Sequence, residues 1–145
     1  MSFSCYVSVG SEVITSGIIE ALLGLGKLVY VPIITSETEM TFVLYDRETE
    51  LLAKDFRVTG SSRQLRQIIP EVSIIPVVAA SQNGTRIGYG RGYYDRWLKK
   101  NGQTQRIGLA FNCQLNEDIF PEEHDQKLDK IITETNVICC TNHSG

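Results

Sequence analysis

The residues with the clearest chemical potential lie in the segment 84–98, which reads GTRIGYGRGYYDRWL. Three glycines alternate there with larger side chains, and three arginines accompany them: Gly88, Gly90 and Gly92, with Arg86, Arg91 and Arg96. Glycine has no Cβ and can adopt positive φ, so backbone N–H groups can close around anionic oxygens. Guanidinium groups bind phosphate oxygens bidentately. Because a plain turn needs no such set of arginines, the segment favours a site for a polyphosphate and its metal ion.

The flanks of this glycine loop support the same interpretation. Residues 74–80 form a continuous apolar run that is typical of a buried parallel strand, and residues 93–100 predict a short helix. The order is therefore strand, glycine loop, helix. The N–H groups and the dipole at the start of such a helix attract negative charge.

Three acidic residues could take part in this chemistry. Asp95 lies in the first turn of the predicted helix, where it could either complement the helix dipole or bind a ligand. Asp125 lies in a charged loop, and Glu12 lies between the first strand and its helix, so each could bind a ligand or face water. Asp95 and Asp125 together would offer a magnesium ion two oxygen ligands, with water and phosphate completing the octahedron.

The remaining elements predict how this loop is positioned. Residues 5–9, 27–33 and 106–111 read as strands, residues 15–25 as an amphipathic helix, and residues 40–45 as a further strand candidate. Short closing strands are expected within 131–140, whereas the polar stretch 46–66 shows no usable periodicity. Alternating strands and helices predict an α/β fold of three layers, with a mainly parallel, open, Rossmann-like sheet and flanking helices. Ligands settle at the carboxyl ends of strands in such sheets, where the glycine loop begins.

Length and composition limit the class of protein. The 145 residues with 42% hydrophobic content suffice for one compact domain, which we expect to span 1–145. A net charge of −3 argues against nucleic-acid binding, and the positive charge concentrated in 84–100 suits a small anionic ligand. The four cysteines and two histidines lack the spacing of a zinc site. No signal peptide or membrane-spanning run is evident, and we expect a cytoplasmic monomer.

At this level of detail the sequence resembles a known family. Gly-Tyr-Tyr-Asp at 92–95, preceded by Ile-Pro-Val-Val at 75–78 and followed by His124-Asp125 and Leu128-Asp129, is similar to the 5-formyltetrahydrofolate cyclo-ligases, also called 5,10-methenyltetrahydrofolate synthetases. The similarity covers nearly the whole chain and is weakest in 46–69. It implies that ATP and 5-formyltetrahydrofolate, with or without a polyglutamate tail, are converted to ADP, phosphate and 5,10-methenyltetrahydrofolate through phosphorylation of the formyl oxygen. ATP and Mg²⁺ are the implied cofactors.

The resemblance also implies residue roles. Catalytic roles would belong to Arg86, Arg91, Tyr93 and Asp95. Contacts with ATP would come from Arg86, Ile87, Gly88, Tyr89, Gly90, Arg91, Gly92, Tyr93 and Tyr94. Contacts with the folate would come from Val7, Glu12, Met40, Tyr89, Gly90, Arg91, Gly92 and Tyr93. Magnesium would be held by Asp95 and Asp125.

The chain departs from the family pattern in places, which keeps alternatives open. The family usually begins with a helical segment carrying basic residues for ATP, whereas this chain opens almost at its first strand. Ala80-Ser81 replaces the common Phe-Asp, and no Glu-Pro follows Phe56-Arg57-Val58. One alternative is a folate-binding or nucleotide-binding relative without turnover. Another is an α/β sugar-phosphate isomerase, which rests on fold analogy alone.

Overall fold

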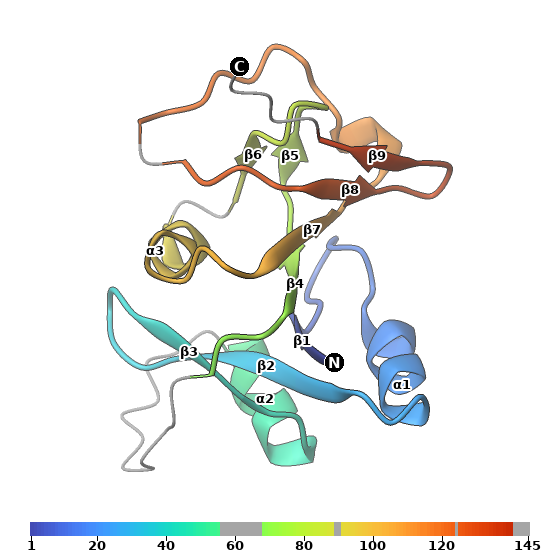
Figure 1. The fold of residues 1–145 in the computed structure, drawn as a ribbon, viewed down its shortest axis with the longest axis vertical. Coiled ribbons are helices and arrows are strands. Elements are labelled where there is room, and N and C mark those ends of the chain that lie inside the picture. The colour runs from blue at the N-terminus through green and yellow to red at the C-terminus, as the bar shows by residue number, and fades with distance from the viewer. Residues whose placement is uncertain (56–67, 89–90, 124, 141–145) are drawn as a thin grey trace.

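A computed structural model describes residues 1–55, 68–88, 91–123 and 125–140, and Figure 1 shows their arrangement. Within these residues, seven strands form one sheet in the order β3-β2-β1-β4-β7-β8-β9. Their bounds are β1 Ser2–Cys5, β2 Leu28–Ile34, β3 Met40–Leu44, β4 Val72–Pro76, β7 Gln105–Leu109, β8 Lys130–Ile132 and β9 Val137–Cys139. A small antiparallel hairpin pairs β5 (Ala79–Ala80) with β6 (Arg86–Ile87). The helices are α1 Ser16–Gly24, α2 Arg47–Asp55 and α3 Tyr93–Lys100, with a 3-10 turn η1 at Asn112–Gln114.

The sheet is mainly parallel, as the alternation of strands and helices predicts. β1 pairs in parallel with β2 and β4, and β7 pairs in parallel with β4 and β8. Only the outermost pairings of this sheet, β2 with β3 and β8 with β9, are antiparallel in the described part of the chain. The predicted α/β class is therefore confirmed. The central strand β4 is buried along its whole length, which explains its continuous apolar sequence.

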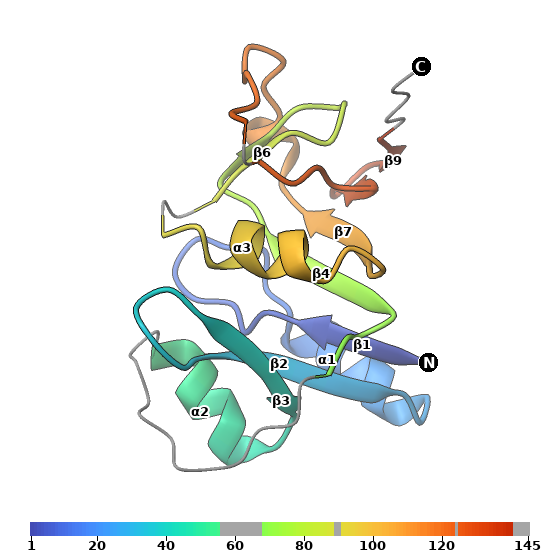
Figure 2. The same cartoon turned by 60° about the vertical axis from the view of Figure 1, so that its left-hand side comes forward.

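Helices cover both faces of the sheet. Neighbouring residues of a strand point to opposite faces, so Ile74 and Ile75 of β4 enter two different cores. Ile74 packs with Ile19 of α1, whereas Ile75 packs with Leu98 of α3. Figure 2 shows α3 and α1 on opposite sides of the strands. This gives the three predicted layers and leaves α3 with the strands β3 and β4 beneath it.

Two predicted strands have different bounds in the structure. The first strand is Ser2–Cys5 rather than 5–9, because the chain leaves the sheet after Cys5 to bind its own loop. There the Thr15 hydroxyl donates to the Tyr6 carbonyl at 2.7 Å. The strand expected at 74–80 ends at Pro76, and Ala79–Ala80 turn away to pair with β6. A hairpin thus separates the buried strand from the glycine loop.

Helix α2 occupies the start of the stretch 46–66, where the sequence predicted no element. Its first turn is closed by a reciprocal pair: the Asp46 N–H donates to Thr49 Oγ1, and the Thr49 N–H donates to Asp46 Oδ1, both at 2.8 Å. This is a capping box of Asp-x-x-Thr type, a signal that was present in the sequence. Packing of Ala53 on Val7 and Val31 holds the helix to the sheet.

None of the described helices is both long and apolar enough to cross a bilayer.

Candidate active site

A buried arginine lies directly below the start of the glycine loop. Arg86 of β6 is only 7% exposed, and its Nη1 donates to the Pro76 carbonyl at 3.3 Å. A Cβ placed on Gly88 would lie 2.5 Å from that Nη1 atom. A larger residue at Gly88 would therefore make the guanidinium of Arg86 shift. The constraint is different at Gly92, which caps α3 with a φ of 70°.

The electrostatics of Arg86 follow from this burial. Desolvation lowers the pKa of the guanidinium, while the negative charges of Asp95 and Asp125 act to raise it. An arginine nevertheless remains protonated at neutral pH. Its Nε is buried without a hydrogen-bond partner among the described residues, and its guanidinium lies 5.6 Å from the centre of the Tyr94 ring. The loop thus has a fixed positive charge beneath it.

Tyr94 lies in the first turn of α3, and groups at and after the carboxyl end of β1 act electrostatically on its hydroxyl. Its ring is half-buried, its hydroxyl oxygen is buried, and it has no hydrogen-bond partner in the described part of the protein. Burial is the main reason that the pKa of this phenol is raised, and the charges of Cys5 and Glu12 raise it further. Tyr94 therefore stays protonated and can donate one hydrogen bond.

The loop that carries Asp125 lies at the start of α3, although thirty positions separate Asp125 from Asp95. Asp95 Oδ1 accepts a hydrogen bond from the backbone N–H of Gln126 at 3.3 Å, which brings the loop around Asp125 to the start of α3. Asp125 Oδ2 accepts from the Glu122 N–H at 2.8 Å. Both carboxylates act electrostatically on Arg86. In the described residues, no group of three or more His, Cys, Asp or Glu side chains forms a metal site.

Glu12 and Val7 occupy the loop that follows β1. Glu12 is 5% exposed, and its Oε1 accepts a hydrogen bond from the Val9 N–H at 2.7 Å, which fixes the carboxylate within the loop. Val7 is buried with Val31 and Ala53, and it also lines a pocket with Ser8. The alternative that Glu12 faces water is wrong, because so little of the residue is exposed.

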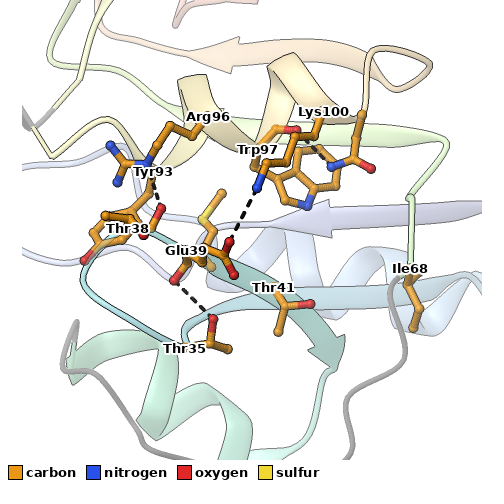
Figure 3. A pocket seen from close by; sticks show the side chains of 11 residues that line it. Thr35, Thr38, Glu39, Thr41, Ile68, Tyr93, Arg96, Trp97 and Lys100 are labelled. Carbon is orange, nitrogen blue, oxygen red and sulfur yellow. Dashed lines mark hydrogen bonds and ion pairs between the residues drawn. The ribbon is translucent and has the colours of Figure 1, made fainter.

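Met40 and Tyr93 line one pocket, of about 350 Å³, between β3 and α3 (Figure 3). Met40 and Trp97 form its apolar part and are each 9% exposed. Polar and charged side chains surround them, contributed by the turn between β2 and β3 and by α3. Trp97 also belongs to the core, because its ring packs edge-on against Phe42 with centroids 4.8 Å apart.

The remaining loop residues divide into two groups. Ile87 is half-exposed at 46% and accepts a hydrogen bond from the Val78 N–H through its carbonyl, whereas Arg91 is exposed. Tyr89 and Gly90 lie outside the described residues, so their predicted contacts stay predictions.

Arg96 lies beside Gly92, the last glycine of the loop, and also reaches the turn between β2 and β3. Its Nε donates to the Thr38 carbonyl at 2.6 Å, and its guanidinium stacks on the Tyr93 ring at 5.1 Å. The sequence did not predict this contact with the β2–β3 turn, and binding of an anion by Arg96 stays a prediction. Sequence reasoning also missed the turn itself, although Ser36-Glu37-Thr38-Glu39 is a polar break between two apolar strands.

Comparisons with known proteins show the family of the chain. A profile described as the 5-formyltetrahydrofolate cyclo-ligase family matches residues 1–134. The chain is 33% identical over 140 residues to 5-formyltetrahydrofolate cyclo-ligase of Escherichia coli K12, covering 91% of this chain and 77% of that protein. It is 27% identical over 146 residues to the mouse protein of the same name, covering 90% of this chain and 72% of that one.

Solved structures share the fold. The 5,10-methenyltetrahydrofolate synthetase of Mycoplasma pneumoniae superposes with a TM-score of 0.66 at 23% identity, over 90% of this chain and 71% of that one. The Aquifex aeolicus protein of that name gives 0.68 at 20% identity, over 99% of this chain and 73% of that one. The profile match and the sequence identities together show that the chain belongs to the 5-formyltetrahydrofolate cyclo-ligase family.

Proposed function

We propose that the protein converts 5-formyltetrahydrofolate and ATP to 5,10-methenyltetrahydrofolate, ADP and phosphate. The formyl oxygen attacks the γ-phosphorus, the bond to the bridging oxygen breaks, and ADP leaves. N10 of the folate then attacks the activated formyl carbon, and the carbon–oxygen bond breaks with loss of phosphate, which carries away the N10 proton. Family membership supports this reaction, and the geometry of the glycine loop supports the assignment of roles.

The nucleotide side of the site would be built on Arg86 and the glycine loop. The buried guanidinium supplies a positive charge that needs no reorganisation when phosphate charge develops. Arg91 is exposed, and we assign it a contact with the γ-phosphate. Positioning and charge neutralisation carry most of the work in phosphoryl transfer, so these residues suit the first step.

Magnesium fits the two carboxylates at the start of α3. Asp95 and Asp125 offer hard oxygen ligands, and Mg²⁺ usually takes one or two carboxylates from the protein and completes its shell with water and phosphate oxygens. When bound there, the ion would neutralise charge on the transferring phosphate. Two carboxylates facing one arginine also leave net negative charge for a cation.

The folate side would be formed by Glu12, Val7, Met40 and Tyr93. Met40 and Tyr93 line the same pocket, and Tyr93 directly follows the last glycine of the loop. The Glu12 carboxylate is held at the carboxyl end of β1, and its charge is felt by the Tyr94 hydroxyl. We assign Glu12 the role of orienting the folate. Its fixed carboxylate would accept hydrogen bonds from the N–H groups of the folate.

One observation carries the proposal: the carboxylates of Asp95 and Asp125 both act electrostatically on the buried guanidinium of Arg86, which lies against Gly88 of the glycine loop. The test is the rise of methenyl absorbance when the protein meets 5-formyltetrahydrofolate and MgATP. Asp95→Asn should lower kcat at least tenfold because one magnesium ligand loses its charge. Asp118→Asn, at an exposed acid elsewhere, should keep the wild-type rate.

Three results would contradict the proposal or a part of it. A folded protein that gives no ATP-dependent absorbance rise would reject the cyclo-ligase activity. Calorimetric binding of ATP and folate without turnover would instead indicate a relative that binds without catalysing. Activity of Asp95→Asn equal to that of the Asp118→Asn control would remove Asp95 from the mechanism.

A further inference from the structure

One face of α3 holds the turn between β2 and β3 by three side chains. Tyr93, Arg96 and Lys100 are spaced three and four positions apart, so they lie on the same side of the helix. The Tyr93 hydroxyl donates to the Ser36 carbonyl at 3.4 Å, and Arg96 Nε donates to the Thr38 carbonyl at 2.6 Å. Figure 3 shows these residues facing the turn, with Lys100 reaching Glu39.

Arg96 is the centre of this contact. Its guanidinium stacks on Tyr93, and its Nη1 lies so close to Gly92 that a Cβ there would be 2.9 Å away. Gly92 is the last glycine of the loop and has a φ of 70°. A single side chain therefore touches the end of the glycine loop, the first residue of α3 and the β2–β3 turn.

The bonds from Tyr93 and Arg96 end on backbone carbonyls of the turn. They hold the path of the chain itself, whichever side chains occupy the turn. Inside the turn, the Glu39 carbonyl accepts hydrogen bonds from the Thr35 and Ser36 N–H groups at 2.9 and 3.3 Å. These bonds close the turn directly before Met40, so a displacement of the turn would also displace the start of β3.

We propose that Arg96 is a positioning residue that couples the two halves of the active site. It ties the wall that carries Met40, on the proposed folate side, to Gly92 and Tyr93, on the proposed nucleotide side. ATP bound against Gly92 and Tyr93 would then favour the position of the turn that suits folate, and folate would in return favour the binding of ATP. This inference rests on the proposed function, since it names the coupling between its two substrates.

The lysine in the same face provides a matched control. Lys100 Nζ lies 3.4 Å from Glu39 Oε1, and both side chains are more than 60% exposed. Exposed ion pairs of this kind contribute little. Lys100→Ala removes a contact with the same turn but leaves the connection from Gly92 to Thr38 intact.

The test is calorimetric titration of 5-formyltetrahydrofolate with and without a saturating non-hydrolysable ATP analogue and Mg²⁺. Coupled sites commonly change each other's affinity 5- to 150-fold, so we expect the wild type to bind folate at least fivefold more tightly with the analogue present. In Arg96→Ala this factor should fall below about twofold. Tyr93→Phe, which keeps the ring, should lower the factor in part. Lys100→Ala should keep it. A purely structural role would lower stability without changing the factor.

Several outcomes would overturn the inference. Turnover with independent binding of the two ligands in the wild type would contradict the coupling and leave the proposed function standing. Undiminished coupling in Arg96→Ala would do the same. Absence of both binding and turnover would reject the proposed function instead. Amide exchange of the free protein adds an independent check: Arg96→Ala should speed exchange at 36–39 and at 91–93 together, whereas unchanged exchange at both would contradict the connection.

Discussion

At the scale of single residues, the close contact between Gly88 and Arg86 leads to a prediction about the kinetics. Because an added Cβ would lie 2.5 Å from Arg86 Nη1, Gly88→Ala must displace a buried guanidinium that is held by the Pro76 carbonyl. We expect the KM for ATP to rise, or kcat to fall, by about tenfold, the cost of a displaced charge of roughly 1.4 kcal/mol in the transition state. Steady-state kinetics measure it. Gly102→Ala, where a Cβ meets open space, should behave as the wild type.

Cys5 should make the free energy of unfolding depend on pH in the alkaline range. Burial raises the pKa of its thiol from 9.0 to about 12, so the folded state holds a proton that the unfolded state loses. The resulting stabilisation is complete below pH 9 and is lost as the pH rises toward 12. Urea unfolding at pH 8 and pH 10.5 should show a decline that is smaller in Cys5→Ala by up to about 2 kcal/mol. The exposed Cys113→Ala should decline as the wild type does.

At the scale of elements, the start of α2 depends on its capping box. Asp46→Ala removes the acceptor for the Thr49 N–H, and we expect a loss of about 1 kcal/mol in the free energy of unfolding. Asp46→Asn keeps an oxygen in place and should stay within a few tenths of a kcal/mol of the wild type. Urea titrations decide between them. An equal loss in both variants would mean that the carboxylate charge, rather than the cap, supports the helix.

The bounds of elements also show where sequence reasoning stops. The helix predicted at 93–100 is confirmed as Tyr93–Lys100 because its aromatic and apolar residues recur one turn apart. The strand predicted at 74–80 was wrong at its end, since Val77 and Ala80 are as apolar as the strand but are buried under α3 instead of paired in the sheet. Burial drives both arrangements, so an apolar run alone does not reveal which one the chain adopts.

At the scale of the whole molecule, ligands of the folded state should raise its stability. MgATP at about one hundred times its Kd adds about 2.7 kcal/mol to the free energy of unfolding if it binds only the folded protein. Thermal unfolding should therefore show a clear increase in Tm. Removing the metal with EDTA should reduce that increase, because Asp95 and Asp125 would then repel the triphosphate. An increase that is insensitive to EDTA would exclude these carboxylates as metal ligands.

The sequence by itself determined the kinds of side chain that gather around residue 90, the α/β class and the family, since these depend on residue type, local periodicity and motif. Only the tertiary structure decided that Arg86 bonds the Pro76 carbonyl and that Arg96 reaches from Gly92 to the β2–β3 turn. Both are arginines in the same glycine-rich segment, and the sequence treats them alike. A long, flexible side chain follows whichever partner the fold brings within hydrogen-bonding distance. The Pro76 carbonyl comes within reach through the β5–β6 hairpin, and the Thr38 carbonyl through the packing of α3 on β3.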